Sequence, residues 1–193
     1  MRKLVISGLI AILTPAVLFG GELKDENLLQ TMPEGFKQGW STSHDGMDMA
    51  EFVAAHETVD TWTRLITTQI FHGKGEMPSG AFLQQWGGRM GNACPGLTHS
   101  QLTTGHRNGY TGSFVQIDCP LNPQTKKPEY VFIEDFQGKD ALYVIQYAFR
   151  YEPSAAEIEN AMSFMRAAII CDTRTKEHPC PDLATQGFKK IAP

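Results

Sequence analysis

The chain has 193 residues, a formal net charge of −4 at pH 7 and 20% charged residues. This length fits one domain behind a short leader, because domains commonly hold about 100–200 residues. The acidic balance, with no run of Lys and Arg longer than two residues, excludes the basic surface of a nucleic-acid-binding protein.

The first residues differ from the rest of the chain. Arg2 and Lys3 precede an apolar run from Leu4 to Phe19. A basic start before a short apolar run is typical of a secretory signal peptide, and the run is marginal for a membrane span. We therefore expect a periplasmic or secreted protein without a membrane span after cleavage, and a retained anchor is the alternative. The expected parts are a signal peptide at 1–21, a single domain at 22–180 and a C-terminal tail at 181–193.

Four cysteines follow the leader: Cys94, Cys119, Cys171 and Cys180. An even number in an exported protein favours disulfides, although sequence alone allows three connectivities. We favour Cys94–Cys119 and Cys171–Cys180, since each pair is adjacent along the chain. In the chain-entropy account, loops of these lengths contribute about 3 kcal/mol each. A metal site of Cys171, His178 and Cys180 is the rival interpretation, and it lacks a fourth ligand.

Strand signals dominate the first part of the domain. Residues 22–32 indicate a short helical or irregular segment, and residues 36–53 predict a hairpin. Its turn is Asp45-Gly46, one of the strongest two-residue hairpin signals. Residues 62–71 are rich in β-branched side chains and predict a strand.

A helix is expected at residues 82–93, where apolar side chains recur at helical spacing and Ser79 is available to cap the start. Two hairpins follow, at residues 97–118 around Asn108-Gly109 and at residues 129–151. Apolar residues on both faces of the last strand predict that it is central in its sheet.

Ser154 and Glu157 form a capping box at the start of a terminal helix. An apolar stripe from Ile158 to Ile170 predicts that this helix packs deeply against the sheet. Together the elements predict an α+β domain. It holds a mostly antiparallel sheet of about six to seven strands, one mid-chain helix and a long C-terminal helix packed on the sheet.

Several strings resemble a group of short exported proteins from proteobacteria. They are "MPEGFKQGW", "MDMAEFVAAHETVDTWTRLITTQIF" and the following helix with Trp86, which span most of the chain after the leader. The order of strands and helices also resembles the PsbP-like α/β sandwich, a fold of photosystem accessory proteins and other binding modules. The resemblance implies an exported binding protein. It transfers no catalytic residue, because the group has no established activity and fold does not imply function.

Candidate catalytic groups are sparse. The segment "TGSFV" around Ser113 lacks the second glycine of a serine nucleophile motif. His56 and Glu57 lie in the loop before a strand, with Asp60 shortly after them, and an extended backbone would aim the two neighbours to opposite sides. Glu134 and Asp135 point to opposite faces of one strand, so they do not form a glycosidase-like pair. We therefore expect no catalytic residue.

Metal and phosphate signals are also weak. His44, Asp45 and Asp48 cluster around a turn, without the H-E-x-x-H spacing that places two imidazoles on one helix face. The glycine-containing loops lack the strand–loop–helix order of a phosphate site. We therefore expect no metal site and no cofactor.

The aromatic residues supply the remaining candidate site. Most must lie in the core, but Phe82, Trp86, Trp62 and Tyr147 are candidates for a ligand groove where the sheet meets the mid-chain helix. We therefore expect a periplasmic binding or accessory module. Its expected partner is another envelope protein or a small apolar ligand. An envelope hydrolase with a site around His56 and Glu57 is the alternative, and a purely structural envelope factor is a third class.

Overall fold

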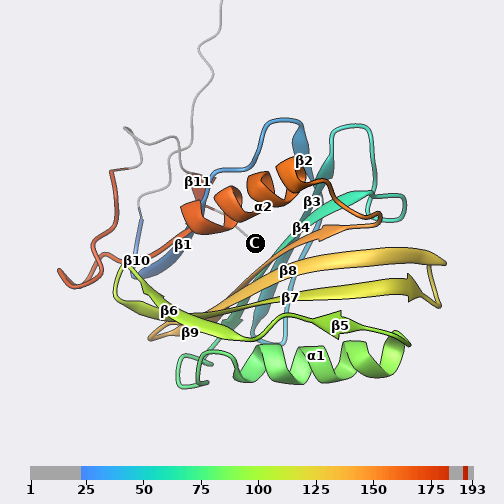
Figure 1. The fold of residues 1–193 in the computed structure, drawn as a ribbon. Helices are drawn as coiled ribbons and strands as arrows, with labels where there is room; N and C mark the ends of the chain where they lie inside the picture. The colour runs from blue at the N-terminus through green and yellow to red at the C-terminus, as the bar shows by residue number, and fades with distance from the viewer. Residues whose placement is uncertain (1–22, 183–188, 191–193) are drawn as a thin grey trace, which may run out of the picture.

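An antiparallel sheet forms the middle layer of the protein, with one helix on each face (Figure 1). The computed structural model describes residues 23–182 and 189–190. The expected signal peptide at 1–21 lies outside the described residues, as does most of the expected tail. No helix in these two described ranges is long and apolar enough to cross a membrane.

Eleven strands and two helices make up the described chain. In order they are β1 (Glu26–Gln30), β2 (Phe36–His44), β3 (Met47–Ala54), β4 (Arg64–His72), α1 (Ala81–Ala93), β5 (Thr98–His99), β6 (Thr103–Arg107), β7 (Tyr110–Asn122), β8 (Lys127–Gln137), β9 (Ala141–Phe149), α2 (Ala155–Ala167), β10 (Ile169–Asp172) and β11 (Lys189–Lys190). The expectation of an α+β domain with a mostly antiparallel sheet is confirmed.

The main sheet has eight strands in the order β2-β3-β4-β9-β8-β7-β5, with β6 also pairing with β7. Every pair is antiparallel. The last hairpin strand, β9, lies in the middle and is buried on both faces, as its apolar sequence predicts. The sheet has more strands than the six to seven expected, because the segment after α1 breaks into two short strands, β5 and β6.

The two-residue turns follow the sequence signals. Asp45 and Gly46 have φ of 51° and 75°, and Asn108 and Gly109 have φ of 47° and 82°. Positive φ at both central residues is the geometry that matches the twist of a tight hairpin. These turns place β2 beside β3 and β6 beside β7, which fixes both edges of the sheet.

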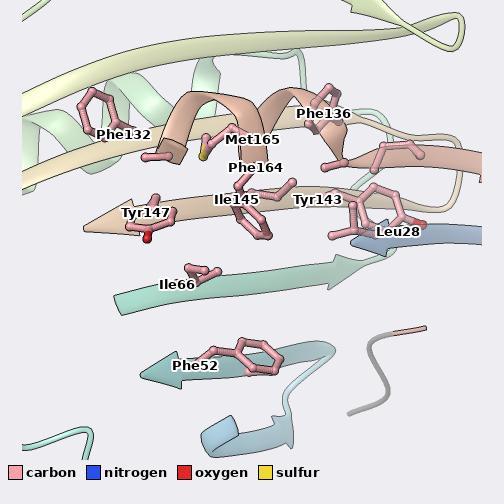
Figure 2. Close-up of a cluster of buried hydrophobic side chains, with 14 of the residues drawn as sticks. Leu28, Phe52, Ile66, Phe132, Phe136, Tyr143, Ile145, Tyr147, Phe164 and Met165 are labelled. Carbon is pink, nitrogen blue, oxygen red and sulfur yellow. The ribbon is translucent and has the colours of Figure 1, made fainter. Parts of the chain in front are cut away.

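The two faces of the sheet carry different cores. The α2 face is aromatic, with Phe132, Phe136 and Phe149 all at or below 1% exposure (Figure 2). The α1 face is mainly aliphatic and includes Val144 and Ile133. Because side chains alternate along each strand, neighbouring residues of β8 and β9 belong to different cores.

Two expectations about elements are corrected. Residues 22–32 contain a strand rather than a helical segment, because β1 pairs with β10 in a second, three-stranded sheet. The terminal helix ends at Ala167 and has 13 residues, the same length as α1, since Ile169–Asp172 continue as β10. Within the expected tail, Lys189–Lys190 pair with β1 as strand β11.

The helix starts show one success and one failure of sequence reasoning. The capping box of Ser154 and Glu157 is present at α2, as predicted. At α1 the N-cap is Gly80, and Ser79 makes no cap. The hydroxyl of Ser79 instead donates to Asp135 Oδ1 at 2.8 Å and lies within hydrogen-bond distance of Ser113 Oγ, also at 2.8 Å.

Candidate functional site

A half-open groove of about 210 Å³ lies on the α2 face of the sheet, close to the β6 edge. Its lining comes from three neighbouring strands, β6, β7 and β8. The lining residues are Thr103, Thr104, Gly105, His106, Arg107, Gly112, Phe114, Glu134 and Phe136. We refer to this hollow as the β6 groove.

Two facing glycines create the β6 groove. Gly105 of β6 and Gly112 of β7 are direct cross-strand partners. A Cβ at Gly105 would meet no heavy atom within 4 Å, whereas a Cβ at Gly112 would lie 2.7 Å from Phe136 Cε1. Gly112 therefore lets the ring of Phe136 approach the strand, and Gly105 leaves the space above it open.

The floor of the β6 groove is aromatic. Phe114 and Phe136 line it, and both belong to the core on the α2 face. Phe114 lies parallel to Phe132 with ring centroids 6.4 Å apart, and Phe132 meets Phe149 edge-on at 6.3 Å. Ring-to-ring packing of this kind stabilises the floor beyond the burial of area alone.

Arg107 ties three elements together at one end of the groove. Its Nη2 donates to both carboxylate oxygens of Glu134 on β8, at 2.9 and 3.2 Å. Its Nη1 donates to the carbonyl oxygens of Met165 and Ala168 at the end of α2, at 2.7 and 3.3 Å. The guanidinium also lies over the ring of Phe136, 4.8 Å from its centroid. Arginine suits this position because its planar fork offers several fixed donors.

Glu134 is a buried carboxyl group in the wall of this groove. Burial raises the pKa of Glu134 to about 7; the Arg107 guanidinium opposes that shift, and the neighbouring Asp135 carboxylate adds to it. Near neutral pH the group therefore exchanges between the protonated and ionised forms. It can accept a hydrogen bond in either form and donate one in the first.

The outer edge of β6 is open within the part of the chain that the structure describes, where β6 pairs with β7 alone. Arg107 and Tyr110 close the two-residue turn, so they form a hydrogen-bonded pair, and such pairs alternate along an antiparallel ladder. The peptide N–H and C=O groups of Thr104 and His106 therefore point away from β7. They are the groups that an added strand would bond.

Asp135, next to Glu134, has a purely structural position on the other face. It is 0% exposed and accepts hydrogen bonds from Ser79 Oγ at 2.8 Å and from the Gly80 N–H at 2.9 Å. Burial raises the pKa of Asp135 against these hydrogen bonds, which favour the carboxylate. The side chain therefore caps the start of α1 from a distant strand.

The four residues expected to line a ligand groove are not brought together. Trp62, Phe82 and Trp86 pack in the α1-side core, whereas Tyr147 lies in the aromatic core on the α2 face (Figure 2). Tyr147 stacks on Phe149 with ring centroids 5.0 Å apart. The separation follows from strand alternation, which directs Tyr147 of β9 away from α1.

The loop of the hydrolase alternative is built as a turn. His56 is exposed, while Glu57 is 9% exposed and accepts hydrogen bonds from the N–H and Oγ1 of Thr63 at 2.9 and 2.6 Å. Burial opposes ionisation, but these bonds and one from the Arg64 N–H outweigh it and hold the pKa of Glu57 below its usual value. The carboxylate fastens the loop that leads into β4, whereas the backbone carbonyl of Asp60 accepts a hydrogen bond from Arg150 Nη1 at 3.4 Å.

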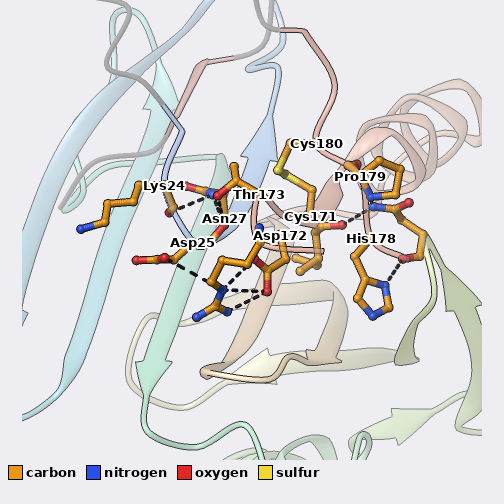
Figure 3. Close-up of a disulfide and its surroundings, with 12 residues drawn as sticks. Lys24, Asp25, Asn27, Cys171, Asp172, Thr173, His178, Pro179 and Cys180 are labelled. Carbon is orange, nitrogen blue, oxygen red and sulfur yellow. Dashed lines mark hydrogen bonds and ion pairs between the residues drawn. A yellow bond between two sulfur atoms is a disulfide. The ribbon is translucent and has the colours of Figure 1, made fainter. Parts of the chain in front are cut away.

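The disulfides join Cys94 to Cys119 and Cys171 to Cys180, the pairs that the sequence favours. The metal site of two cysteines and His178 is therefore not formed. Instead His178 Nδ1 lies 2.8 Å from the carbonyl oxygen of Asn108, so the Cys171–Cys180 loop docks on the turn between β6 and β7 (Figure 3). In residues 23–182 and 189–190, no three His, Cys, Asp or Glu side chains are grouped to hold a metal ion.

Sequence reasoning missed the residues of the β6 groove. Glu134 was considered only as half of a carboxylate pair, and Arg107 and the two glycines carried no expectation. One signal was present: Gly105 and Gly112 stand at equal distances from the Asn108-Gly109 turn. A two-residue turn makes them cross-strand partners, and two facing glycines leave a gap in a sheet surface.

No protein-family model and no curated protein matches the chain. Solved structures to which the chain is similar include a mutant of the protein Mog1 (14% identity, covering 76% of this chain and 92% of that one, TM-score 0.44). A second is the Ran-binding protein Mog1p of Saccharomyces cerevisiae (14% identity, covering 76% of this chain and 80% of that one, TM-score 0.41). A third is LpqN, involved in cell envelope biogenesis of Mycobacterium tuberculosis (11% identity, covering 78% of this chain and 87% of that one, TM-score 0.43). At this level of similarity, nothing follows about what this chain binds.

Proposed function

We propose that this chain is an exported binding module that recognises an extended segment of a protein partner along the open edge of β6. The observation that carries the proposal is a small, aromatic-floored groove directly beside a strand edge that no other described strand pairs with. Strand addition to a sheet edge is a recurrent mode of peptide recognition, in which backbone bonds give affinity and a side-chain pocket gives specificity.

The size of the groove supports a protein partner over a small apolar ligand, the two kinds of partner expected from the sequence. Sites for small organic ligands commonly enclose about 300–1,000 Å³. The β6 groove, at about 210 Å³, is smaller and half open. It suits a single side chain of a protein partner better than a complete small apolar ligand.

The binding mode follows from the register of β6. An added strand bonds the outward N–H and C=O groups of Thr104 and His106. Residues on its inner face then lie over Gly105, where there is room for one side chain. Arg107 keeps β6 attached to α2 and β8, so the groove is formed before the partner arrives.

Export is part of the same proposal. The basic and apolar leader supports a signal peptide at 1–21, and two disulfides are compatible with an oxidising compartment. The partner is then another protein of the periplasm or envelope. The fold, an antiparallel sheet with one helix on each face, also supports the resemblance to the PsbP-like α/β sandwich. That resemblance is part of the proposal.

A displayed library of random heptapeptides, selected on the oxidised protein, tests this function. We expect selected peptides to bind the parent and to bind Gly105→Leu at least about tenfold more weakly, because the leucine occupies the groove from a position where its Cβ meets no heavy atom within 4 Å. Gly88→Ala is the matched control, since a Cβ there also meets no atom within 4 Å but lies in α1, away from the groove. Equal binding to both variants, or no selected peptide at all, would contradict the proposal.

A further inference from the structure

We infer that the β6 groove selects a tyrosine or tryptophan side chain, which packs on Phe136 and donates its O–H or N–H to the carboxyl group of Glu134. This inference rests on the proposed function, because it names the side chain that the bound segment inserts. It follows from the hydrogen-bonding capacity, the charge and the shape of the groove.

Glu134 has acceptor capacity to spare. Within the described chain, its side chain receives hydrogen bonds from Arg107 Nη2 alone. A carboxylate offers about four lone-pair positions, so part of this capacity remains free. The side chain is 12% exposed and lines the groove, so the remaining acceptor positions are within reach of a group that enters the groove.

The charges in the groove disfavour an ionic side chain. The Nη atoms of Arg107 are engaged by Glu134 and by two carbonyl oxygens of α2, so they offer little to an incoming carboxylate, which would also meet Glu134. A lysine or arginine would meet the Arg107 guanidinium in a partly desolvated site. A like charge in such a place is costly. A neutral hydrogen-bond donor avoids both conflicts.

The remaining walls of the groove favour a flat, apolar body. Phe114 and Phe136 present ring surfaces on the floor, and Gly105 leaves the space above them open. Aromatic side chains pack well in offset or edge-on contact with such rings. A leucine or phenylalanine would cover Glu134 without giving it a donor, and desolvating a polar group without a partner costs binding energy. Tyrosine and tryptophan combine the aromatic body with a donor.

Short β-forming peptides provide the test. The probes are Ac-Thr-Val-Xaa-Val-Thr-NH2, where Xaa is tyrosine, tryptophan, phenylalanine or leucine. Dissociation constants are measured by NMR titration of the oxidised ¹⁵N-labelled protein, which detects millimolar binding. We expect the tyrosine and tryptophan peptides to bind the parent about tenfold more tightly than the phenylalanine and leucine peptides, as for one hydrogen bond to a charged group.

Two variants locate the effect. Glu134→Gln keeps the size of the side chain and lowers its strength as an acceptor, so the preference for tyrosine over phenylalanine should shrink to about threefold or less. Gly105→Leu should weaken all four peptides together. The peptide series on the parent protein is decisive even if Glu134→Gln folds poorly.

The outcomes separate this inference from the proposed function. If phenylalanine or leucine peptides bind as tightly as tyrosine, and Gly105→Leu still abolishes binding, the inference is wrong and the proposed function stands. If none of the peptides binds, and library selection also fails, both are wrong. If Gly105→Leu leaves both the affinity of the tyrosine peptide and its advantage over phenylalanine unchanged, the recognition lies elsewhere and the inference is wrong.

Discussion

Glu134 and Asp135 are adjacent on β8, and they have opposite surroundings. Asp135 faces α1 and is fully enclosed, with donors from Ser79 and Gly80 on its carboxylate. Glu134 faces the other way, receives one guanidinium and lines an open groove. Two buried acidic groups on one strand can thus differ in role because only one has its capacity filled by the fold.

The difference extends to the two faces of the sheet. On one face, α1 packs against β7 and β8, and its first turn covers the end of β8. On the other, α2 packs against β8 and β9. At the β6 end of that face lie the ion pair of Arg107 and Glu134 and the two facing glycines, Gly105 and Gly112. The closed face therefore stabilises the domain, and the open end of the other is available for binding.

The largest effect is expected on the closed face, at Trp62. Its side chain is 7% exposed, and the Arg150 guanidinium lies 3.8 Å from its ring centroid. Trp62→Ala should lower the free energy of unfolding by about 4 kcal/mol, measured by urea denaturation of the oxidised protein. Trp86→Ala is the control, because Trp86 is only half-buried and should cost about 2 kcal/mol. Equal losses would show that the α1 face is not closed around Trp62.

The next effect separates the two acidic neighbours. Asp135→Asn places an NH2 group beside the donors Ser79 Oγ and Gly80 N–H, so at least one of these buried donors loses its acceptor. The free energy of unfolding should fall by about 3 kcal/mol. Glu134→Gln keeps an acceptor for Arg107 in a partly open site and should cost about 1 kcal/mol at pH 7. Urea denaturation of both variants measures the contrast. A greater loss from Glu134→Gln would reverse the comparison.

The pH dependence of stability sharpens the contrast at Glu134. Burial raises the pKa of Glu134 from an ordinary value of 4.5 to about 7 in the folded protein. Between these two values the folded state binds more protons than the unfolded state, so stability falls as the pH rises from about 4.5 to about 7. This contribution should be about 3 kcal/mol in the parent and absent in Glu134→Gln. Identical pH profiles of the free energy of unfolding would contradict the buried position of the group.

The smallest effects distinguish the two glycines. Gly112→Ala forces a Cβ against the ring of Phe136 and should cost about 2 kcal/mol. Gly105→Ala meets open space in an extended strand and should change stability by less than about 0.5 kcal/mol. Thermal melts of both variants test the difference. A similar cost at both positions would mean that the space above Gly105 is filled.

The features that depend on neighbouring residues could be predicted from the sequence. The turns at Asp45-Gly46 and Asn108-Gly109, the capping box of Ser154 and the opposite directions of Glu134 and Asp135 are all local, and the structure confirms each. Strand alternation alone was sufficient to exclude a carboxylate pair on β8.

The features that depend on distant pairing could not be predicted. β1 was missed because its strand partner, β10, lies more than a hundred residues later in the chain. The expected groove at Tyr147 failed because the sequence does not tell which face of β9 receives α1. The sequence signals the two facing glycines of the β6 groove, but its wall also depends on an ion pair between β6 and β8 and on a carbonyl contact with α2. No local pattern encodes these contacts.

Amide hydrogen exchange at the edge of β6 tests the central claim most directly. The oxidised protein is compared with and without saturating Ac-Thr-Val-Tyr-Val-Thr-NH2. An added strand should slow exchange of the outward amides of Thr104 and His106 by at least about tenfold. The amides of β2, at the opposite edge of the sheet, should not change. Unchanged exchange at Thr104 and His106 in the presence of bound peptide, or equal protection at β2, would contradict the claim that β6 is the binding edge.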